Sequence, residues 1–576
     1  MCGIAGIFGP NISEERLRSM VEVQVHRGPD GQGIYLDPKG RAGLGHCRLR
    51  IIDLSDAGHQ PMVDPSGRYV MAFNGEIYNY IELRRELESS WQFRTKTDSE
   101  VLLAAYLKWG EGCLDRLMGM FSFFIWDSER ATLFAARDRF GVKPFYYGKG
   151  SDGCWYAASE IKALHRGGVP KEPDELTWAS YLTYGVYDHD DKSFWRHISK
   201  LPPGHFLTLC GDDLRLKQWY NLPERVGAGF DERPIAVIKE EYFELLKQSI
   251  RLRFRSDVEV GINLSGGLDS SALFTLVKEM GEGKVGVNAF TFITGDERYD
   301  ELPWVRQIVE GSDCPLITCL LRPEDVPGLA SEVSRNQDEP FGGFPTLAYA
   351  RLFQTAREMN VIVLLDGQGM DEQLAGYDYY SRASAVAMNM GPVQGSKSSA
   401  TLAECLQPDF RGGARPLEVK GFFNNPLQNL QYRDIHQTKI PRALRFNDRV
   451  SMMYSCELRE PFLDHRMVEL GFRLPERLKI KDGKGKWLLR DILTDLLPAA
   501  VGEAPKRPVQ TPQREWLQSE LASWGGECID QALSGWGGLW FDRDKVHDAW
   551  RDFTTNGRDN SFPFWQWISL GLLQDK

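Results

Sequence analysis

Two stretches of this chain carry residues that could do chemistry: a run rich in glycine and serine, and a cysteine at position two. The run, Leu264 to Ser271, reads Leu-Ser-Gly-Gly-Leu-Asp-Ser-Ser. Its two glycines let backbone N–H groups approach an anion closely, and its serine hydroxyls add further donors. Asp269 in this run is a more natural ligand for Mg²⁺ than for phosphate. The spacing therefore predicts a phosphate-binding loop.

The elements on either side of this run would hold it in place. The apolar stretch from Val258 to Leu264 is typical of a buried parallel strand, and Leu268 to Met280 has apolar residues at helical spacing. A phosphate would then lie at a helix N-terminus, where free N–H groups and the helix dipole favour it. The Lys-Ser/Thr of a Walker motif is absent, and the run instead resembles the loop of ATP pyrophosphatases. An ordinary strand-to-helix turn is the alternative interpretation.

The cysteine at position two predicts a nucleophile. Met1 is usually removed before a small residue, which would make Cys2 the N-terminus. Its α-amino group, with a pKa near 8, could then accept the thiol proton, so one residue would supply nucleophile and base. A buried structural cysteine is the alternative, because free cysteine is among the most buried residue types.

Composition narrows the class of protein. The 576 residues suffice for two or three domains, and the formal net charge of -11 disfavours nucleic acid or an anionic membrane as partner. The ten cysteines have no zinc-ligand spacing, which predicts a reduced, cytoplasmic chain. No apolar run of about 18 residues predicts a membrane span, and the start of the chain lacks the pattern of a secretory signal.

Further motifs follow the cysteine at wide spacing. They are His26 to Gly31, Gly45 to Leu49, Phe73 to Asn79 and Thr97 to Glu100. Together with Cys2 they resemble the glutaminase domain of class II glutamine amidotransferases, an N-terminal-nucleophile fold. Singly, an Asn-Gly pair is most often a hairpin turn and an aspartate before a helix is most often a cap.

This resemblance implies roles for individual residues. Cys2 would attack the glutamine side-chain amide, while the side chain of Asn74 and the N–H of Gly75 would form the oxyanion hole. Glutamine itself would be bound by Arg48, Asn74, Glu76 and Asp98, with Arg48 on its α-carboxylate and the two acids on its α-ammonium.

The second half of the chain alternates strand-like and helix-like runs, including Val285 to Phe292, Leu316 to Leu321 and Val361 to Leu365. This pattern predicts an open parallel sheet with ligands beyond the carboxyl ends of its strands. A second glycine and aspartate loop, Asp366 to Glu372, follows the last of these runs. With Asp448 to Met452, Ser455 to Asp464 and Lys486 to Arg490, the chain resembles the glutamine-hydrolysing asparagine synthetases from Cys2 to about Trp516.

That wider resemblance implies ATP and Mg²⁺ as cofactors. Asp269 and Asp371 would ligate the metal, and Lys486 would be a catalytic residue that balances charge on pyrophosphate or the acyl-adenylate. The ATP-binding residues would be Leu264, Ser265, Gly266, Gly267, Asp269, Ser270, Ile293, Asp366 and Gly367. A solvated surface lysine is the alternative for Lys486.

The second loop departs from the family pattern. The family usually has Ser-Gly-Glu-Gly-Ala-Asp-Glu, whereas this chain has Asp366 and Gln368 at the serine and first glutamate positions. A glutamate could act as a base, but a glutamine can only hydrogen-bond. We therefore hypothesise that Gln368 marks a subgroup whose acceptor differs from free aspartate.

The leading prediction is an enzyme that amidates aspartate with glutamine nitrogen and ATP. Amidation of another carboxylate, such as a uronic acid of a surface polysaccharide or a natural-product precursor, is the nearest alternative. A tRNA-modifying pyrophosphatase and a catalytically silent scaffold are less favoured. Glutamine and a carboxylic acid are the expected partners, without nucleic acid or a membrane span, and a homodimer is compatible with the sequence.

The predicted fold class is an α+β N-terminal-nucleophile sandwich (αββα) followed by an α/β domain with a parallel sheet of the ATP pyrophosphatase type. We expect the glutaminase domain at residues 1–210, the ATP pyrophosphatase domain at 225–520 and a helical extension at 521–576. Residues 381–430 carry no motif and receive no function.

Overall fold

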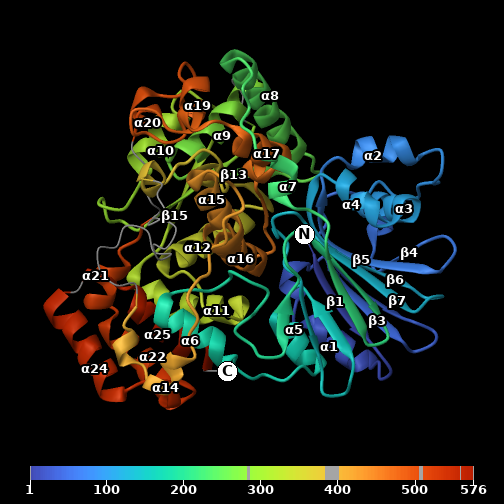
Figure 1. The fold of residues 1–576 in the computed structure, drawn as a ribbon, viewed down its shortest axis with the longest axis horizontal. Helices are drawn as coiled ribbons and strands as arrows, with labels where there is room; N and C mark the ends of the chain where they lie inside the picture. The colour runs from blue at the N-terminus through green and yellow to red at the C-terminus, as the bar shows by residue number, and fades with distance from the viewer. Residues whose placement is uncertain (1, 282–285, 383–400, 505–509, 558, 575–576) are drawn as a thin grey trace.

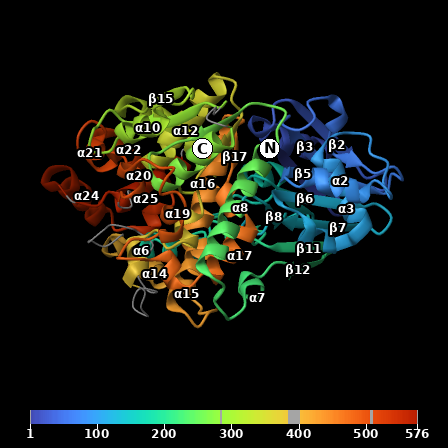
Figure 2. The ribbon, with the colours of Figure 1, turned by 90° about the horizontal axis from the view of Figure 1, so that it is seen from above.

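The computed structural model of the protein describes residues 2–281, 286–382, 401–504, 510–557 and 559–574. Two bodies lie side by side, an N-terminal one built on two antiparallel sheets and a C-terminal one built on a parallel sheet (Figure 1). Viewed from above, α8 (Ile235–Arg253) and α17 (His465–Arg473) lie near the boundary between the bodies (Figure 2). Within the described residues, no helix is long and apolar enough to cross a membrane.

The N-terminal body stacks its two sheets face to face. The first has the order β10-β8-β9-β1-β3-β2, with β1 (Gly3–Phe8), β2 (Gly31–Leu36), β3 (Ala42–Arg48), β8 (Tyr146–Lys149), β9 (Trp155–Ala158) and β10 (Ile198–Lys200). The second has the order β12-β11-β7-β6-β5-β4, with β4 (Met62–Val63), β5 (Tyr69–Ile77), β6 (Gly119–Asp127), β7 (Thr132–Arg137), β11 (His205–Cys210) and β12 (Asp213–Gln218).

Apolar side chains fill the space between these sheets, and helices cover their outer faces. Ile4 and Leu44 of the first sheet meet Val70 and Phe124 of the second in one buried cluster. One outer face carries α1 (Glu14–Glu22) and α5 (Ile161–Gly167), and the other carries α2 (Tyr80–Leu87), α3 (Asp98–Trp109) and α4 (Cys113–Arg116). The predicted αββα sandwich is confirmed.

The C-terminal body has a five-stranded parallel sheet in the order β15-β14-β13-β16-β17. Its strands are β13 (Val260–Asn263), β14 (Ala289–Ile293), β15 (Leu316–Leu320), β16 (Val363–Leu365) and β17 (Glu457–Arg459). The chain runs outward from β13 to β15 and then returns to β16, so the order reverses between β13 and β16. Ligands of open parallel sheets bind beyond the carboxyl ends at such a reversal.

Helices pack on both faces of this sheet because its strands are apolar on both sides. Ile262 and Val363 contact one layer, which includes α8, α9 (Leu268–Met280), α10 (Leu302–Val309), α17 and α19 (Trp487–Ile492). Phe290 and Leu364 contact the other layer, which includes α11 (Val326–Gln337), α12 (Phe344–Glu358) and α16 (Lys439–Met453). The predicted parallel-sheet domain is therefore confirmed, although residue 285 of its second expected strand lies outside the described residues.

Shorter and C-terminal helices complete the body. They are α6 (Glu175–Tyr184), α7 (Leu222–Val226), α13 (Met370–Gln373), α14 (Pro408–Gly412), α15 (Pro426–Arg433), α18 (Glu476–Lys479), α20 (Ala499–Gly502), α21 (Gln513–Gln518), α22 (Ala522–Ser534), α23 (Gly537–Trp540), α24 (Arg543–Asp552) and α25 (Phe562–Gln574). Side chains of α22 and α25 share the core of the layer that includes α11 and α12. The division into three domains stays a prediction.

Candidate active sites

The first candidate site is centred on Cys2, directly before β1. Cys2 is buried, and its backbone N–H donates to Oδ1 of Asn74 at 3.0 Å. Nε of Arg27 donates to the Cys2 carbonyl at 3.1 Å, so both backbone groups of the cysteine are fixed. Burial raises the pKa of the Cys2 thiol. A neighbouring base is therefore needed to form a thiolate near neutral pH.

Asn74 and Gly75 lie within a strand and not in the hairpin turn that an Asn-Gly pair would suggest by itself. They pair with Ser122 and Phe121 of β6 in the antiparallel register. Gly75 has a φ of +150°, and a Cβ atom there would lie 2.1 Å from the carbonyl oxygen of Met120. Only glycine fits this backbone, which keeps Asn74 beside Cys2.

Substituting Gly75 with alanine is expected to reduce glutamine hydrolysis by about 100-fold or more, the effect of losing one oxyanion donor. The added methyl group would force β5 away from β6 and displace the Gly75 N–H. The rate of glutamate release measures this effect. Gly67→Ala is the control, because Gly67 also has a positive φ but has open space around its Cβ position. Equal rates in the two variants would contradict the assignment.

Asn74 and Glu76, two of the four expected glutamine-binding residues, lie near the end of β5, and the other two are Arg48 and Asp98. The Arg48 guanidinium is anchored by the carbonyls of Ser55 and Asp53, at 2.6 and 2.5 Å. Asp98 opens α3, and its Oδ2 accepts from the N–H of Ile77 at 2.9 Å. Thr97, not Asp98, caps this helix by accepting from the N–H of Glu100. The carboxylate of Asp98 is thus held beside β5 and not used as a cap.

Two acids in this site are electrostatically unusual. Burial raises the pKa of Asp98 to about 6, against the lowering effect of the Ile77 hydrogen bond. Burial also raises the pKa of Glu76, and the charges of Glu457 and Asp98 raise it further. The Arg459 guanidinium, 3.7 Å from Glu76, offsets part of this negative charge, and the α-ammonium of glutamine would offset more of it.

The raised pKa of Asp98 predicts a pH dependence of glutamine binding. Below about pH 6 the carboxyl is protonated and loses its attraction for the ammonium, so kcat/KM for glutamine should fall with decreasing pH. Asp98→Asn should raise KM by about 10- to 100-fold and remove this acid limb, because a hydrogen bond to a charged group contributes about 1.5–3 kcal/mol. A glutaminase pH profile checks both effects, and an unchanged profile in Asp98→Asn would refute the role.

The second candidate site begins at the loop between β13 and α9. Gly266 has a φ of +72°, which lets the chain turn sharply before the helix. Oγ of Ser270 accepts from the Ser265 N–H at 3.1 Å and lies 3.0 Å from Oγ of Ser265. Oγ of Ser271 donates to the Gly267 carbonyl at 2.6 Å. These bonds fold the serines back over the start of α9, which is the geometry of a helix N-terminal anion site.

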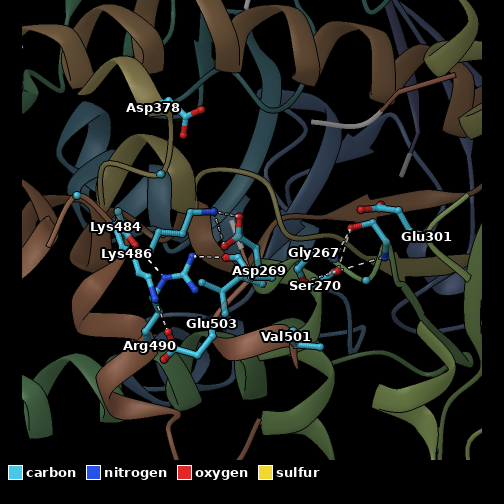
Figure 3. A pocket seen from close by; sticks show the side chains of 17 residues that line it. Gly267, Asp269, Ser270, Glu301, Asp378, Lys484, Lys486, Arg490, Val501 and Glu503 are labelled. Atoms are coloured by element: carbon cyan, nitrogen blue, oxygen red, sulfur yellow. Dashed lines mark hydrogen bonds and ion pairs between the residues drawn. The ribbon is translucent and has the colours of Figure 1, made fainter. Parts of the chain in front are cut away.

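Lys486 joins this loop to the loop that follows β16. Its Nζ lies 2.7 and 2.6 Å from the two carboxylate oxygens of Asp269 and 2.5 Å from Oδ1 of Asp371. Figure 3 shows the lysine and Asp269 turned toward one another across the pocket. The lysine is 3% exposed, so the surface-lysine alternative is wrong for its position.

A pocket of about 310 Å³ opens in front of these groups. Most of the first loop lines it, together with Glu301, Asp378 and the glycine-rich segment around Lys484. Leu264 directly follows β13 and Ile293 ends β14, and both lie outside the pocket lining. Gly367 packs against the loop, since a Cβ at this position would lie 3.2 Å from Cβ of Asp269.

Several lining residues received no role from the sequence. Lys484 and Glu503 form an ion pair at the pocket rim. The Arg490 guanidinium donates to the carbonyl of Ala504, next to Glu503, at 3.1 Å. Gly483 and Gly485 flank Lys484, and this Gly-Lys-Gly-Lys spacing before Trp487 is the signal that could have identified a second phosphate-side loop.

Buried ion pairs connect the two bodies. Arg27 forms a two-pronged pair with Asp448 at 2.9 and 3.2 Å and also contacts Glu160 at 3.0 Å. On β17, Arg459 lies 2.5 Å from Glu457 and 3.7 Å from Glu76 of the first site. Two C-terminal motifs, around Asp448 and around Glu457, therefore hold the glutaminase-like body against the parallel-sheet body.

Comparisons with known proteins agree with this architecture. The profile of the glutamine amidotransferase domain matches residues 1–220, and that of asparagine synthase matches residues 241–574. "Asparagine synthetase [glutamine-hydrolyzing] 1" of Bacillus subtilis (strain 168) is 28% identical over 98% of this chain and 95% of its own. A second Bacillus subtilis asparagine synthetase is 30% identical over 88% of this chain and 71% of its own.

A relative with a different name, "Amidase chry2" of Gibberella zeae, is 26% identical over 90% of this chain and 88% of its own. The fold and the two profiles define a glutamine amidotransferase domain joined to a nucleotide-binding parallel-sheet domain. The chain belongs to the asparagine synthase family, whose members are ATP-dependent ligases.

Proposed function

We propose that this protein is a glutamine-dependent amidotransferase that adenylates the side-chain carboxylate of aspartate with ATP and amidates it to asparagine. The observation that carries the proposal is the pairing of two sites in one chain, with Cys2 and Asn74 in one and the Ser265 to Ser271 loop with Lys486 in the other. The nitrogen released at the first site would be used at the second through an internal channel.

At the first site, Cys2 would attack the glutamine amide. Removal of Met1 would convert its N–H, now 3.0 Å from Oδ1 of Asn74, into an amine that accepts the thiol proton. The side chain of Asn74 and the N–H of Gly75 would stabilise the oxyanion, while Arg48, Glu76 and Asp98 would hold the α-carboxylate and α-ammonium. Ammonia leaves, and water releases glutamate from the thioester.

At the second site, the first loop and α9 would bind the ATP phosphates, with Leu264, Ile293, Asp366 and Gly367 near the adenosine. The carboxylate would attack the α-phosphorus and release pyrophosphate, whose growing charge Lys486 would balance. Cleavage of ATP to AMP fits this loop, which lacks the lysine of a Walker motif.

Mg²⁺ fits the chemistry of this donor set. Asp269 and Asp371 converge on a single cation, the Lys486 ammonium, so two carboxylates already face a common point. Among the described residues no cluster of three or more His, Cys, Asp or Glu forms a metal site, so phosphate and water oxygens would complete the coordination. When bound, the metal would neutralise phosphate charge.

A specific observation favours a second candidate, amidation of a different carboxylate. Asp366 and Gln368 replace the usual serine and glutamate. The loop thus has a neutral amide where the family has an acid. The relative named as an amidase shows that this architecture also occurs under a different activity name.

A screen of carboxylic acids tests the proposal. Each acid is mixed with glutamine and ATP, pyrophosphate release is followed, and the amide product is identified by mass. Aspartate is expected to give asparagine with AMP. Efficient turnover of a uronic acid or another acid without aspartate turnover would favour the second candidate. We also propose a cytoplasmic location, since ATP and glutamine are abundant there.

A further inference from the structure

Three polar residues form a row at the carboxyl edge of the parallel sheet. In the strand register, Ile262 pairs with Leu365, and Leu365 pairs with Arg459. The next residues along these strands are Asn263, Asp366 and Glu460, so their side chains leave three adjacent strands at one level. All three are at most 5% exposed. Two of them are carboxyls, in a place where burial of an unpaired carboxylate is costly.

Each carboxyl of this row has one oxygen without a hydrogen-bond partner among the described residues. Oδ1 of Asp366 accepts from Nδ2 of Asn263 at 3.2 Å and from the Gly367 N–H at 2.8 Å, whereas Oδ2 has no hydrogen-bond partner among the described residues. Oε2 of Glu460 likewise has none within that part of the chain. Buried polar atoms are normally satisfied, so these oxygens indicate a missing proton donor.

The row lies between the two candidate sites. Glu460 directly follows Arg459, whose guanidinium lies 3.7 Å from Oε1 of Glu76 at the glutamine end. Asp366 directly precedes Gly367, which packs on Asp269 of the phosphate loop. If nitrogen passes from the first site to the second, we expect it to meet this row before it reaches the phosphate loop.

The charges around Glu460 determine whether its carboxyl is protonated. Burial raises the pKa of Glu460, and the Asp366 charge raises it further, against the lowering effects of Lys143, the Gln368 N–H and Arg253. Burial raises the pKa of Asp366 to about 6. Two neighbouring acids with raised pKa values titrate as a coupled pair, so the charge of one sets the proton affinity of the other.

We propose that Glu460 and Asp366 form a nitrogen-receiving pair, in which the free oxygens accept hydrogen bonds from ammonia and Glu460 takes the proton that amide formation releases. This inference rests on the proposed function. The ammonia lone pair forms the C–N bond to the acyl carbon, and the C–O bond to AMP breaks with its electron pair going to the phosphate oxygen. One N–H proton passes to the Glu460 carboxylate. Gln368 is a neutral amide and cannot accept it.

Glu460→Gln separates this role from the others, because it keeps the shape of the side chain and removes the base. Three rates are measured: glutamate release, ATP–pyrophosphate exchange with aspartate in the absence of glutamine, and asparagine formation. The first two should be unchanged, and asparagine formation should fall by about 100-fold or more, the usual contribution of a general base. Glu358→Gln, on the exposed end of α12, is the matched control.

Asp366→Asn tests the positioning role of the second acid. Removing its charge lowers the pKa of Glu460, so the acid limb of the amide-forming pH profile should move to lower pH. A uniform loss of rate without this shift would mean that Asp366 is only structural. If Glu460→Gln loses glutaminase activity and is therefore misfolded, Asp366→Asn serves as the test in its place.

Four outcomes would overturn the inference or separate it from the proposed function. Normal asparagine formation by Glu460→Gln overturns it, and so does loss of the exchange reaction, which would place the pair in acceptor or nucleotide binding. If the wild type shows no exchange with aspartate, the proposed acceptor fails, and infrared difference spectra then decide. On addition of ammonium chloride, the wild type should gain a protonated-carboxyl band that Glu460→Gln lacks, and identical spectra would refute the pair.

Discussion

Replacing Cys2 with alanine is expected to abolish glutamine hydrolysis, with a loss of about 10⁴-fold or more, because no other group can replace the nucleophile. Asparagine formation with glutamine should be lost in parallel. ATP–pyrophosphate exchange should remain, because the pocket around Ser265 and Lys486 belongs to the other body. Glutamate release and exchange, measured on the same preparation, check this separation.

Cys210→Ala is the control for this variant, since Cys210 is an exposed cysteine on β11. It should behave as the wild type in both assays. Ammonium chloride should support amide formation in Cys2→Ala, because it supplies the nitrogen that the first site no longer provides. Residual glutamine-dependent synthesis in Cys2→Ala would place the nucleophile elsewhere and contradict the account.

Replacing Lys486 with alanine should have the opposite effect to Cys2→Ala: exchange should be lost and glutamine hydrolysis kept. The variant leaves Asp269 and Asp371 without their shared cation, and repulsion between these acids would add to the loss of charge at the phosphates. We expect ATP–pyrophosphate exchange to fall by about 10²- to 10³-fold or more. Glutamate release should persist, because Cys2 and Asn74 make no use of this lysine.

Arginine should not rescue this position. Gly376 approaches so closely that a Cβ there would lie 2.2 Å from Cε of Lys486, which leaves no room for a planar guanidinium. Lys481→Ala is the control: Lys481 is exposed and lies before this segment, so its replacement should leave the exchange rate unchanged. Exchange at the wild-type rate in Lys486→Ala would show that the ion pairs are structural and that the adenylation chemistry lies elsewhere.

Much of the parallel sheet could be predicted because its central strands are apolar on both faces. β13 and β16 fall inside the expected runs, and the two loops that follow them meet at the reversal of strand order. β17 could not be predicted in this way. Its three residues include Glu457 and Arg459, which are fully buried as an ion pair, so hydropathy gives the wrong signal.

The contacts between sites depend on tertiary structure that local patterns do not encode. Arg27 and Asp448 are 421 residues apart, and neither residue type at its position predicts the other as partner. Asn74 and Gly75 have the strongest local signal for a turn, yet β6 holds them in a strand. The Asp366 to Glu460 adjacency likewise depends on the pairing of β16 with β17.

Transfer of labelled nitrogen tests the central claim most directly. Wild-type protein is incubated with aspartate, ATP and glutamine that carries ¹⁵N in its side-chain amide, and the products are quantified by mass. We predict ¹⁵N in the new amide, with glutamate, AMP and pyrophosphate formed in equal amounts. Formation of ADP and phosphate in place of AMP and pyrophosphate, or glutamate release without any labelled amide from a carboxylate, would contradict the account.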